Sequence, residues 1–199
     1  MRRRNKGGVL LLGGLLCLTA ALCFCLWNLR EQMRAERAAQ EARIQLSEQL
    51  SPRMKVQEEV SDPDRSMPVV EVDGQQYIGL LEIPALDRTL PVQSEWSDTA
   101  LETAPCRYQG SLYRGDLIIA GHNYRSHFGT LSRLEPGDFI YFTDGEGIRY
   151  TFEVDALETL SGTDFAGMES GDWDLTLFTC TWGGQNRLAV RCVVKMDTA

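Results

Sequence analysis

An uninterrupted apolar run near the N-terminus is the feature that most constrains the fold of this 199-residue chain. Residues 7–27 carry no formally charged side chain. At a helical rise of about 1.5 Å per residue, this run extends roughly 31 Å, which matches the hydrocarbon core of a bilayer. Soluble domains rarely contain such a run beside a basic flank, so we expect a transmembrane helix over residues 7–29.

Basic residues on one side of this run predict its orientation. Three arginines and Lys6 precede it, and the positive-inside rule places such a flank in the cytoplasm. We therefore expect a single-pass protein of the cell membrane, with residues 1–6 in the cytoplasm and the rest of the chain outside. A cleaved signal peptide is the alternative, since Ala20 and Ala21 offer small residues, but the run exceeds the usual length of about 7–15 residues.

Net charge separates the chain into two parts. The total of −8 is the sum of +4 over residues 1–50, from 8 basic and 4 acidic side chains, and −12 over residues 51–199, from 12 basic and 24 acidic ones. An acidic region without a basic stripe repels phosphate, so we exclude a nucleic-acid partner. With two histidines, no CxxC pair and no EF-hand spacing, we expect no metal site and no other cofactor.

Residues 30–50 have a composition typical of an exposed helix. They contain no Gly or Pro, are rich in Ala, Glu, Gln and Arg, and have only a thin apolar stripe. We therefore expect a solvated helical stalk, with a short coiled coil as the alternative. Three prolines among many charges then mark residues 51–68 as a flexible linker. A folded domain is expected over residues 69–199.

Short β-rich runs separated by turn residues dominate the region after the linker. The expected strands cover residues 77–83, 89–92, 117–120, 139–142, 149–160, 175–180 and 187–194. The expected helical segments are short and cover residues 98–103, 128–134 and 164–169. Gly, Pro and Asp between the runs favour turns. This spacing predicts a mainly β domain that forms a closed barrel or a sandwich.

Three residues suited to nucleophilic chemistry lie at the ends of expected strands. Cys180 ends one strand, His122 ends another, and Arg187 begins a third across the six-residue turn TWGGQN. An imidazole beside a thiol forms the thiolate–imidazolium pair of cysteine catalysis, and a fixed cation stabilises the oxyanion formed on attack. Taken singly, Cys180 could be a small core residue, His122 a turn residue and Arg187 a solvated cation. The inference therefore rests on the three together.

Other residues compete for these roles. His127 falls in a polar loop rather than at a strand end, and Arg191 lies four residues beyond Arg187, roughly 13 Å along a strand. Cys106 and Cys192 are the other cysteines outside the apolar run, and they form either a disulfide or two buried thiols. Because three is an odd number, we expect at least one free thiol there.

The segments TLFTC at 176–180, AGHN at 120–123 and RLAV at 187–190 give the chain a family resemblance. With these motifs in the order His, Cys, Arg, the sequence resembles the sortases, which are cell-surface cysteine transpeptidases of Gram-positive bacteria. The likeness covers roughly residues 75–195, and the segment at 77–92 resembles the opening strands of that family. Since no second hydrophobic segment lies near the C-terminus, the resemblance favours a class B-like or D-like sortase with a single anchor.

The resemblance implies a closed eight-stranded β-barrel with short helices, preceded by the transmembrane helix and the stalk. It implies that Cys180 is the nucleophile, His122 the general acid and base, and Arg187 the stabiliser of substrate and oxyanion. In the family reaction, the thiolate attacks the Thr–Gly bond of a Leu-Pro-X-Thr-Gly-like sorting signal at the C-terminus of a surface protein. The resulting thioacyl enzyme passes that protein to an amine of a peptidoglycan precursor or a pilin.

Three further residues are expected to touch the substrate. Thr179 precedes the nucleophile, Trp182 lies in the turn after it, and Asn123 follows the histidine. Thr179 could equally be a β-branched strand residue and Asn123 a turn former. Two other functions remain as alternatives: a surface cysteine protease that uses water as the acceptor, and a non-catalytic β-barrel binding module on a stalk.

Overall fold

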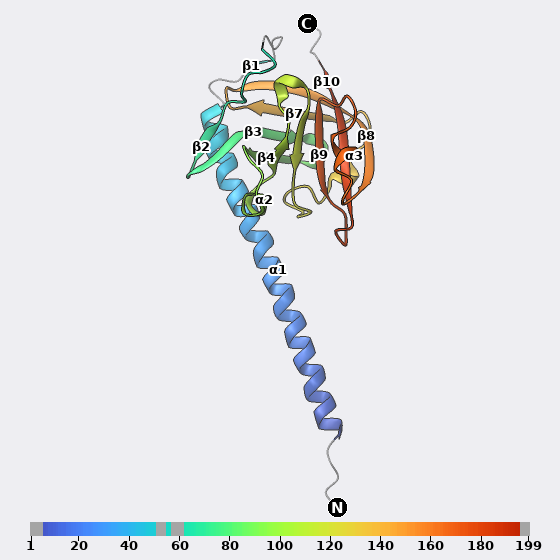
Figure 1. Ribbon diagram of the computed structural model, residues 1–199. Coiled ribbons are helices and arrows are strands. Elements are labelled where there is room, and N and C mark those ends of the chain that lie inside the picture. The colour runs from blue at the N-terminus through green and yellow to red at the C-terminus, as the bar shows by residue number, and fades with distance from the viewer. Residues whose placement is uncertain (1–5, 51–54, 57–61, 196–199) are drawn as a thin grey trace, which may run out of the picture. The chain divides into compact units, whose positions relative to one another are not determined.

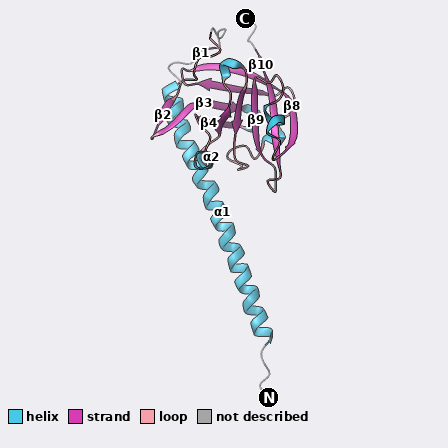
Figure 2. Cartoon of the chain, viewed as in Figure 1, coloured by secondary structure: helices cyan, strands magenta, loops and turns pink. Residues whose placement is uncertain are grey.

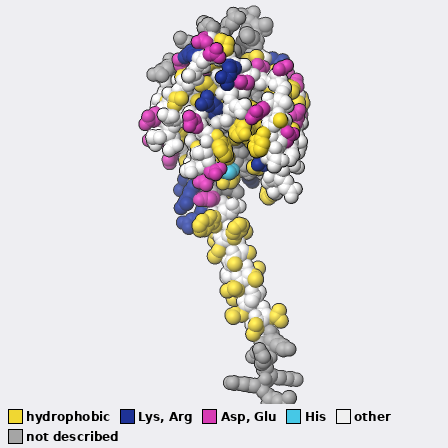
Figure 3. Space-filling model, viewed as in Figure 1, with side chains coloured by type: hydrophobic (Ala, Val, Ile, Leu, Met, Phe, Trp, Pro, Cys, Tyr) yellow, Lys and Arg dark blue, Asp and Glu magenta, His cyan; other side chains and the backbone are white. Residues whose placement is uncertain are grey.

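The computed structural model describes residues 6–50, 55–56 and 62–195. It divides into two compact units, Met1–Arg34 and Ala35–Ala199. Helix α1 (Lys6–Leu50) contributes its first part to one unit and its last part to the other. In the first unit the apolar side chains of α1 are exposed (Figure 3). Among the described residues, α1 is the one helix long and apolar enough to cross a membrane.

The second unit is built mainly from strands joined in one sheet (Figures 1 and 2). They are β1 (Lys55–Val56), β2 (Val70–Val72), β3 (Gln75–Ile83), β4 (Arg88–Gln93), β5 (Cys106–Gln109), β6 (Leu117–Ala120), β7 (Phe139–Asp144), β8 (Ile148–Ser161), β9 (Leu175–Cys180) and β10 (Asn186–Lys195). From β3 they follow the order β3-β4-β5-β6-β9-β10-β8, and β7 pairs with both β8 and β3. This pairing closes a ring, which confirms the expected eight-stranded barrel; β1 and β2 lie outside it.

Helical segments in this unit are short. They are α2 (Asp98–Thr103), α3 (Phe165–Glu169) and three 3-10 turns, η2 (Pro84–Leu86), η3 (Leu112–Arg114) and η4 (Leu131–Arg133). α2 forms where expected because the Ser97 hydroxyl caps it, accepting from the Ala100 N–H at 3.0 Å. The helix expected over 128–134 is reduced to η4. Sequence reasoning also missed the strands β2 and β5, of three and four residues.

The interior of the barrel is a continuous apolar core. Leu81, Phe142, Leu177 and Val190, from four different strands, are each 0% exposed. Burial of each such side chain stabilises the fold by about 1.5–3 kcal/mol. This packing fixes the strands firmly and therefore fixes the positions of residues at their ends.

The last part of α1 packs on the barrel instead of standing in solvent. Ala42, Leu46 and Leu50 form a buried cluster with Tyr77 and Leu80 of β3. The helix expected over residues 30–50 is present, but its second half is not the solvated stalk predicted from its composition. Small alanines contribute to the buried stripe, which made it look thin in the sequence. The compact unit therefore begins at Ala35, well before the expected domain start at residue 69.

Candidate active site

Three neighbouring strands bring the predicted catalytic residues together at one end of the barrel. β6 and β9 run parallel, while β9 and β10 run antiparallel with Cys180 directly opposite Arg187. The Gly121 N–H donates to the Phe178 carbonyl at 3.0 Å, so the chain continues alongside β9 after β6 ends. His122 therefore follows beside the end of β9 that carries Cys180.

These residues line one cavity with a volume of about 530 Å³. Cys180, His122, Arg187 and Thr179 all contribute to its wall. The rest of the wall is largely apolar, with Asp98, Ser161 and Asp164 as its other polar side chains. Its large apolar side chains are Trp96, Leu101, Tyr108, Phe165, Met168 and Phe178. A cavity with an apolar wall and a few converging polar groups is the usual form of a ligand site.

Alternation along β9 explains how one strand serves both the core and this cavity. Leu175 and Leu177 belong to the apolar core of the barrel. Phe178 and Cys180 line the cavity instead. Successive side chains of a strand point to opposite faces, so the cavity lies on the outer face of the barrel. Tyr108 packs edge-on against Phe178, with ring centroids 5.3 Å apart, and gives the cavity an aromatic floor.

The surroundings of His122 favour its neutral form. Burial lowers the pKa of this half-buried imidazole, while the carboxylates of Glu102 and Asp98 oppose the shift. A neutral imidazole can accept a proton from a thiol. The Tyr124 ring lies against it, with centroids 4.8 Å apart and planes inclined by 30°, and restricts its orientation.

The Arg187 guanidinium is held by the backbone of the turn that precedes it. Its Nη1 donates to the carbonyls of Gly184 at 3.0 Å and Asn186 at 3.2 Å. The Thr181 N–H also donates to the Asn186 carbonyl, at 3.0 Å, and closes the turn. A fixed cation opposite a thiol can stabilise negative charge on the sulfur or on a substrate oxygen.

Comparison with known proteins decides the family. A model of the Sortase domain matches residues 81–195, more than half of the chain. The chain belongs to the sortase family. The cysteine, the histidine and the arginine described above all lie within the matched residues.

Several solved sortase structures resemble this barrel. Sortase C1 from Streptococcus agalactiae is 28% identical, with a TM-score of 0.55 over 64% of this chain and 72% of that chain. Sortase C from Streptococcus pneumoniae is 24% identical, with a TM-score of 0.56 over 85% and 91%. Sortase C from Clostridium perfringens, solved with the C-terminal cell wall sorting motif, is 21% identical, with a TM-score of 0.53 over 60% and 71%. No curated protein matches the chain.

In this sortase, the two competing residues lie away from the cavity wall. His127 is 1% exposed, and burial lowers its pKa to about 4. Arg191 is also 1% exposed, and its guanidinium donates to the Met168 carbonyl at 2.8 Å under α3. The geometry therefore favours His122 and Arg187 as the cavity's imidazole and cation.

Only one of the three expected substrate-binding residues lines the cavity. Thr179 contributes to its wall, whereas Trp182 and Asn123 do not. Trp182 is 97% exposed. Gly183 and Gly184, with φ of 87° and 73°, turn the chain back toward β10 directly after it.

Sequence reasoning missed the apolar wall. Trp96 and Tyr108 precede and follow α2, and Phe165 and Met168 belong to α3. The three-residue spacing within α3 was the one available signal, since residues three apart share a helix face. The cavity combines segments that are far apart in the chain, so no local pattern could reveal it.

The two other cysteines of the barrel unit are buried and lie apart from the cavity wall. Cys106 and Cys192 are free, buried thiols, as in one of the two alternatives considered above. Burial raises the pKa of Cys106 to about 12, so it remains a thiol. Within the described residues, no group of three or more His, Cys, Asp or Glu side chains could hold a metal ion.

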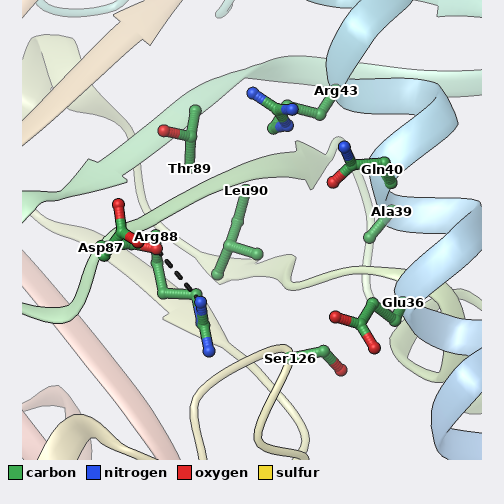
Figure 4. Close-up of a pocket in the computed structure, with 9 residues that line it drawn as sticks. All are labelled: Glu36, Ala39, Gln40, Arg43, Asp87, Arg88, Thr89, Leu90 and Ser126. Carbon is green, nitrogen blue, oxygen red and sulfur yellow. Dashed lines mark hydrogen bonds between the residues drawn. The ribbon is translucent and has the colours of Figure 1, made fainter.

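A separate cavity of about 250 Å³ lies between α1 and the start of β4 (Figure 4). Glu36 and Arg43 of α1 line one side, and Asp87 and Arg88 line the other. Arg88 Nη1 donates to the Asp87 carbonyl at 3.1 Å. This polar cavity shares no residue with that of Cys180, so it is not part of the candidate active site.

Proposed function

We propose that this sortase is a membrane-anchored cysteine transpeptidase that cleaves a Leu-Pro-X-Thr-Gly-like sorting signal and joins the cleaved protein to an amine. The observation that carries the proposal is the convergence of Cys180, His122 and Arg187 on one largely apolar cavity of a sortase barrel. Together these side chains can supply a nucleophile, an acid–base group and an oxyanion stabiliser.

The first half-reaction forms a thioester. Cys180 gives its thiol proton to the neutral His122 imidazole, and the thiolate attacks the threonine carbonyl carbon of the sorting signal. Arg187 stabilises the negative charge that develops on the carbonyl oxygen. The imidazolium then donates its proton to the departing glycine nitrogen, the C–N bond breaks, and the threonine remains joined to Cys180.

The second half-reaction releases the protein. An amine of a peptidoglycan precursor or a pilin attacks the thioester carbonyl, and His122 takes the proton that the amine loses. The C–S bond breaks and Cys180 departs as a thiolate, which leaves a new amide. Attack by water would instead leave a free carboxylate, and the enzyme would then be a protease.

The apolar wall supports a peptide with apolar side chains as the donor, such as the Leu and Pro of a sorting signal. Clostridium perfringens sortase C, which was solved with a cell wall sorting motif, supports the same substrate class. Thr179 borders the cavity, but its side chain is 4% exposed and alternates toward the inner face of β9, so its backbone would touch the peptide. Trp182 and Asn123 would reach only a substrate that extends beyond the cavity.

The apolar part of α1 supports a location in the cell membrane. Residues 7–29 would cross the bilayer once, with residues 1–6 in the cytoplasm and residues 30–199 outside. In that orientation the catalytic barrel meets surface proteins that carry C-terminal sorting signals, and it meets the amines of the growing cell wall.

One assay separates transfer from hydrolysis. Full-length protein in detergent micelles is incubated with a quenched Leu-Pro-X-Thr-Gly peptide library, with and without an amine acceptor such as triglycine. We expect faster cleavage with the acceptor and a ligated product in the mass spectrum. Cleavage at a rate that ignores the acceptor, without ligation, would identify a protease, and no cleavage of any peptide would contradict the proposal.

A further inference from the structure

Arg191 is a buried cation that the proposed chemistry does not use. It is 1% exposed, lies on β10 four residues after Arg187, and faces Thr176 of β9. Its ion-pair partner is Glu158 of β8, with Nε 3.0 Å from Oε2. A buried charge is costly unless its donors are satisfied, so the other contacts of this side chain indicate its role.

Two of these contacts hold helix α3. Arg191 Nη2 donates to the Gly167 carbonyl at 2.6 Å, and Nη1 donates to the Met168 carbonyl at 2.8 Å. Nη1 also donates to the Thr176 hydroxyl at 3.1 Å, which ties the guanidinium to β9. The last carbonyls of a helix have no partner within it. Arg191 therefore supplies from the barrel the donors that the end of α3 lacks.

The same helix forms part of the active-site wall. Phe165 and Met168 line the cavity, and so does Asp164 just before the helix. The Asp164 carboxylate caps the start of α3, accepting from the Gly167 N–H at 2.9 Å. α3 is thus held by Asp164 at its beginning and by Arg191 at its end.

Packing alone is a weak restraint on this wall. A helix of five residues is too short to be stable by itself. Met168 is 5% exposed and packs against Ile118 and Ala189 of the barrel, whereas Phe165 is 62% exposed. Apolar packing therefore anchors α3 through one side chain only. The Ser170 hydroxyl also donates to the Gly167 carbonyl, at 3.0 Å, but it belongs to the same segment and does not join α3 to the barrel. Hydrogen bonds from a cation are stronger than neutral ones, so the Arg191 contacts are a strong polar link between the end of α3 and the barrel.

We propose that Arg191 is a positioning residue that fixes α3 as a wall of the substrate cavity and thereby sets the affinity for the acyl donor. It does so without touching the reacting atoms. The inference rests on the proposed transpeptidase function, because the cavity must receive the donor peptide. Loss of the Arg191 hydrogen bonds to α3 therefore raises the KM for the donor and leaves kcat and the reactivity of Cys180 nearly unchanged.

The test uses Arg191→Lys, which keeps the charge but lacks the planar fork that reaches several acceptors at once. The matched control is Arg149→Lys, since Arg149 is also a strand arginine with a carboxylate partner, Glu82 at 3.1 Å, but its ion pair does not involve α3. Both are prepared as full-length protein in micelles. We measure donor KM and kcat, the alkylation rate of Cys180 by iodoacetamide, and hydrogen exchange over residues 164–170.

For Arg191→Lys we expect a KM increase on the order of 10-fold, because small displacements of a binding wall are costly. We expect kcat and alkylation to change less than about twofold, and faster exchange over 164–170. The control should match the unmodified protein in all four measurements. Unchanged KM and exchange in Arg191→Lys would overturn the proposal, and so would a parallel fall of kcat and alkylation, which would indicate general unfolding.

A double variant tests whether Arg191 changes the donor KM by positioning α3. Phe165→Ala removes an exposed wall residue and should itself raise the donor KM. If Arg191 acts by placing α3, the KM increases of Arg191→Lys and Phe165→Ala will combine to less than their product, whereas full multiplication contradicts the mechanism. If the unmodified protein shows no Cys180-dependent transfer, the proposed function fails, and hydrogen exchange still decides whether Arg191 holds α3.

Discussion

The inner and outer faces of β9 and β10 are built from alternate residues of the same two strands, yet they differ in character. The inner face contributes Leu177, Val190 and Cys192 to a core that excludes water. The outer face presents Cys180 and Arg187 to an open cavity. This difference teaches that the barrel core supplies rigidity while the groups able to react sit where a substrate can reach them.

The largest difference in activity should appear between alanine variants of Cys180, on the outer face, and Cys192, on the inner face. We expect Cys180→Ala to abolish the thioacyl intermediate, with transfer falling by roughly 10⁴-fold or more, because no other group replaces the nucleophile. Mass spectrometry of the enzyme incubated with the donor peptide detects the adduct. Cys192→Ala should keep full activity per folded molecule and lose only stability. An adduct that persists in Cys180→Ala would place the nucleophile elsewhere.

A second contrast concerns His122 and His127, which both lie in the loop after β6. His122→Ala should lower kcat/KM by about 10²- to 10⁴-fold, the usual contribution of a positioned acid–base group. His127→Ala should lower it less than about tenfold, since His127 does not line the cavity. Steady-state kinetics with the donor peptide measures both variants. Equal losses would mean that the imidazole has been assigned to the wrong residue.

On the inner face, Leu177→Ala should reduce stability without changing the chemistry. Leu177 is 0% exposed, and truncating such a side chain typically lowers the free energy of unfolding by about 2–5 kcal/mol. Phe178→Ala, its neighbour on the outer face, should cost less stability and raise the donor KM. Urea denaturation measures the stability of the two variants, and steady-state kinetics measures their donor KM. A larger stability loss in Phe178→Ala, or a larger KM increase in Leu177→Ala, would contradict the assignment of the two faces.

A smaller effect should appear in the pH dependence of stability. Burial lowers the pKa of His127 from 6.5 to about 4. The unfolded chain therefore binds a proton at this residue between those pH values while the folded protein does not, so stability falls as pH falls through that range. The loss should be no more than about 3 kcal/mol at pH 4. In His127→Gln, the free energy of unfolding should fall less between pH 6.5 and pH 4 than in the unmodified protein. The same fall in both proteins would contradict the assignment of this effect to His127.

Much of the barrel was predictable because strand signals are local. The β-rich runs at 117–120 and 175–180 coincide with β6 and β9, and α2 begins where Ser97 supplies a cap. β5 was missed because four residues between Pro105 and Gly110 leave almost no periodic signal. The buried stripe of α1 was underestimated because Ala42 is small, and its burial depends on Tyr77 from a distant strand.

The sequence by itself determined the apolar helix, the strand content and the identity of the three candidate catalytic residues. These features follow from side-chain chemistry and from spacing within short segments. Tertiary structure alone decided that Thr179 borders the cavity while Trp182 does not, and that Arg191 holds the end of α3 instead of competing with Arg187. Those outcomes depend on which strands become neighbours and on which face each residue then occupies. Pairing between distant segments sets both, and no local pattern encodes it.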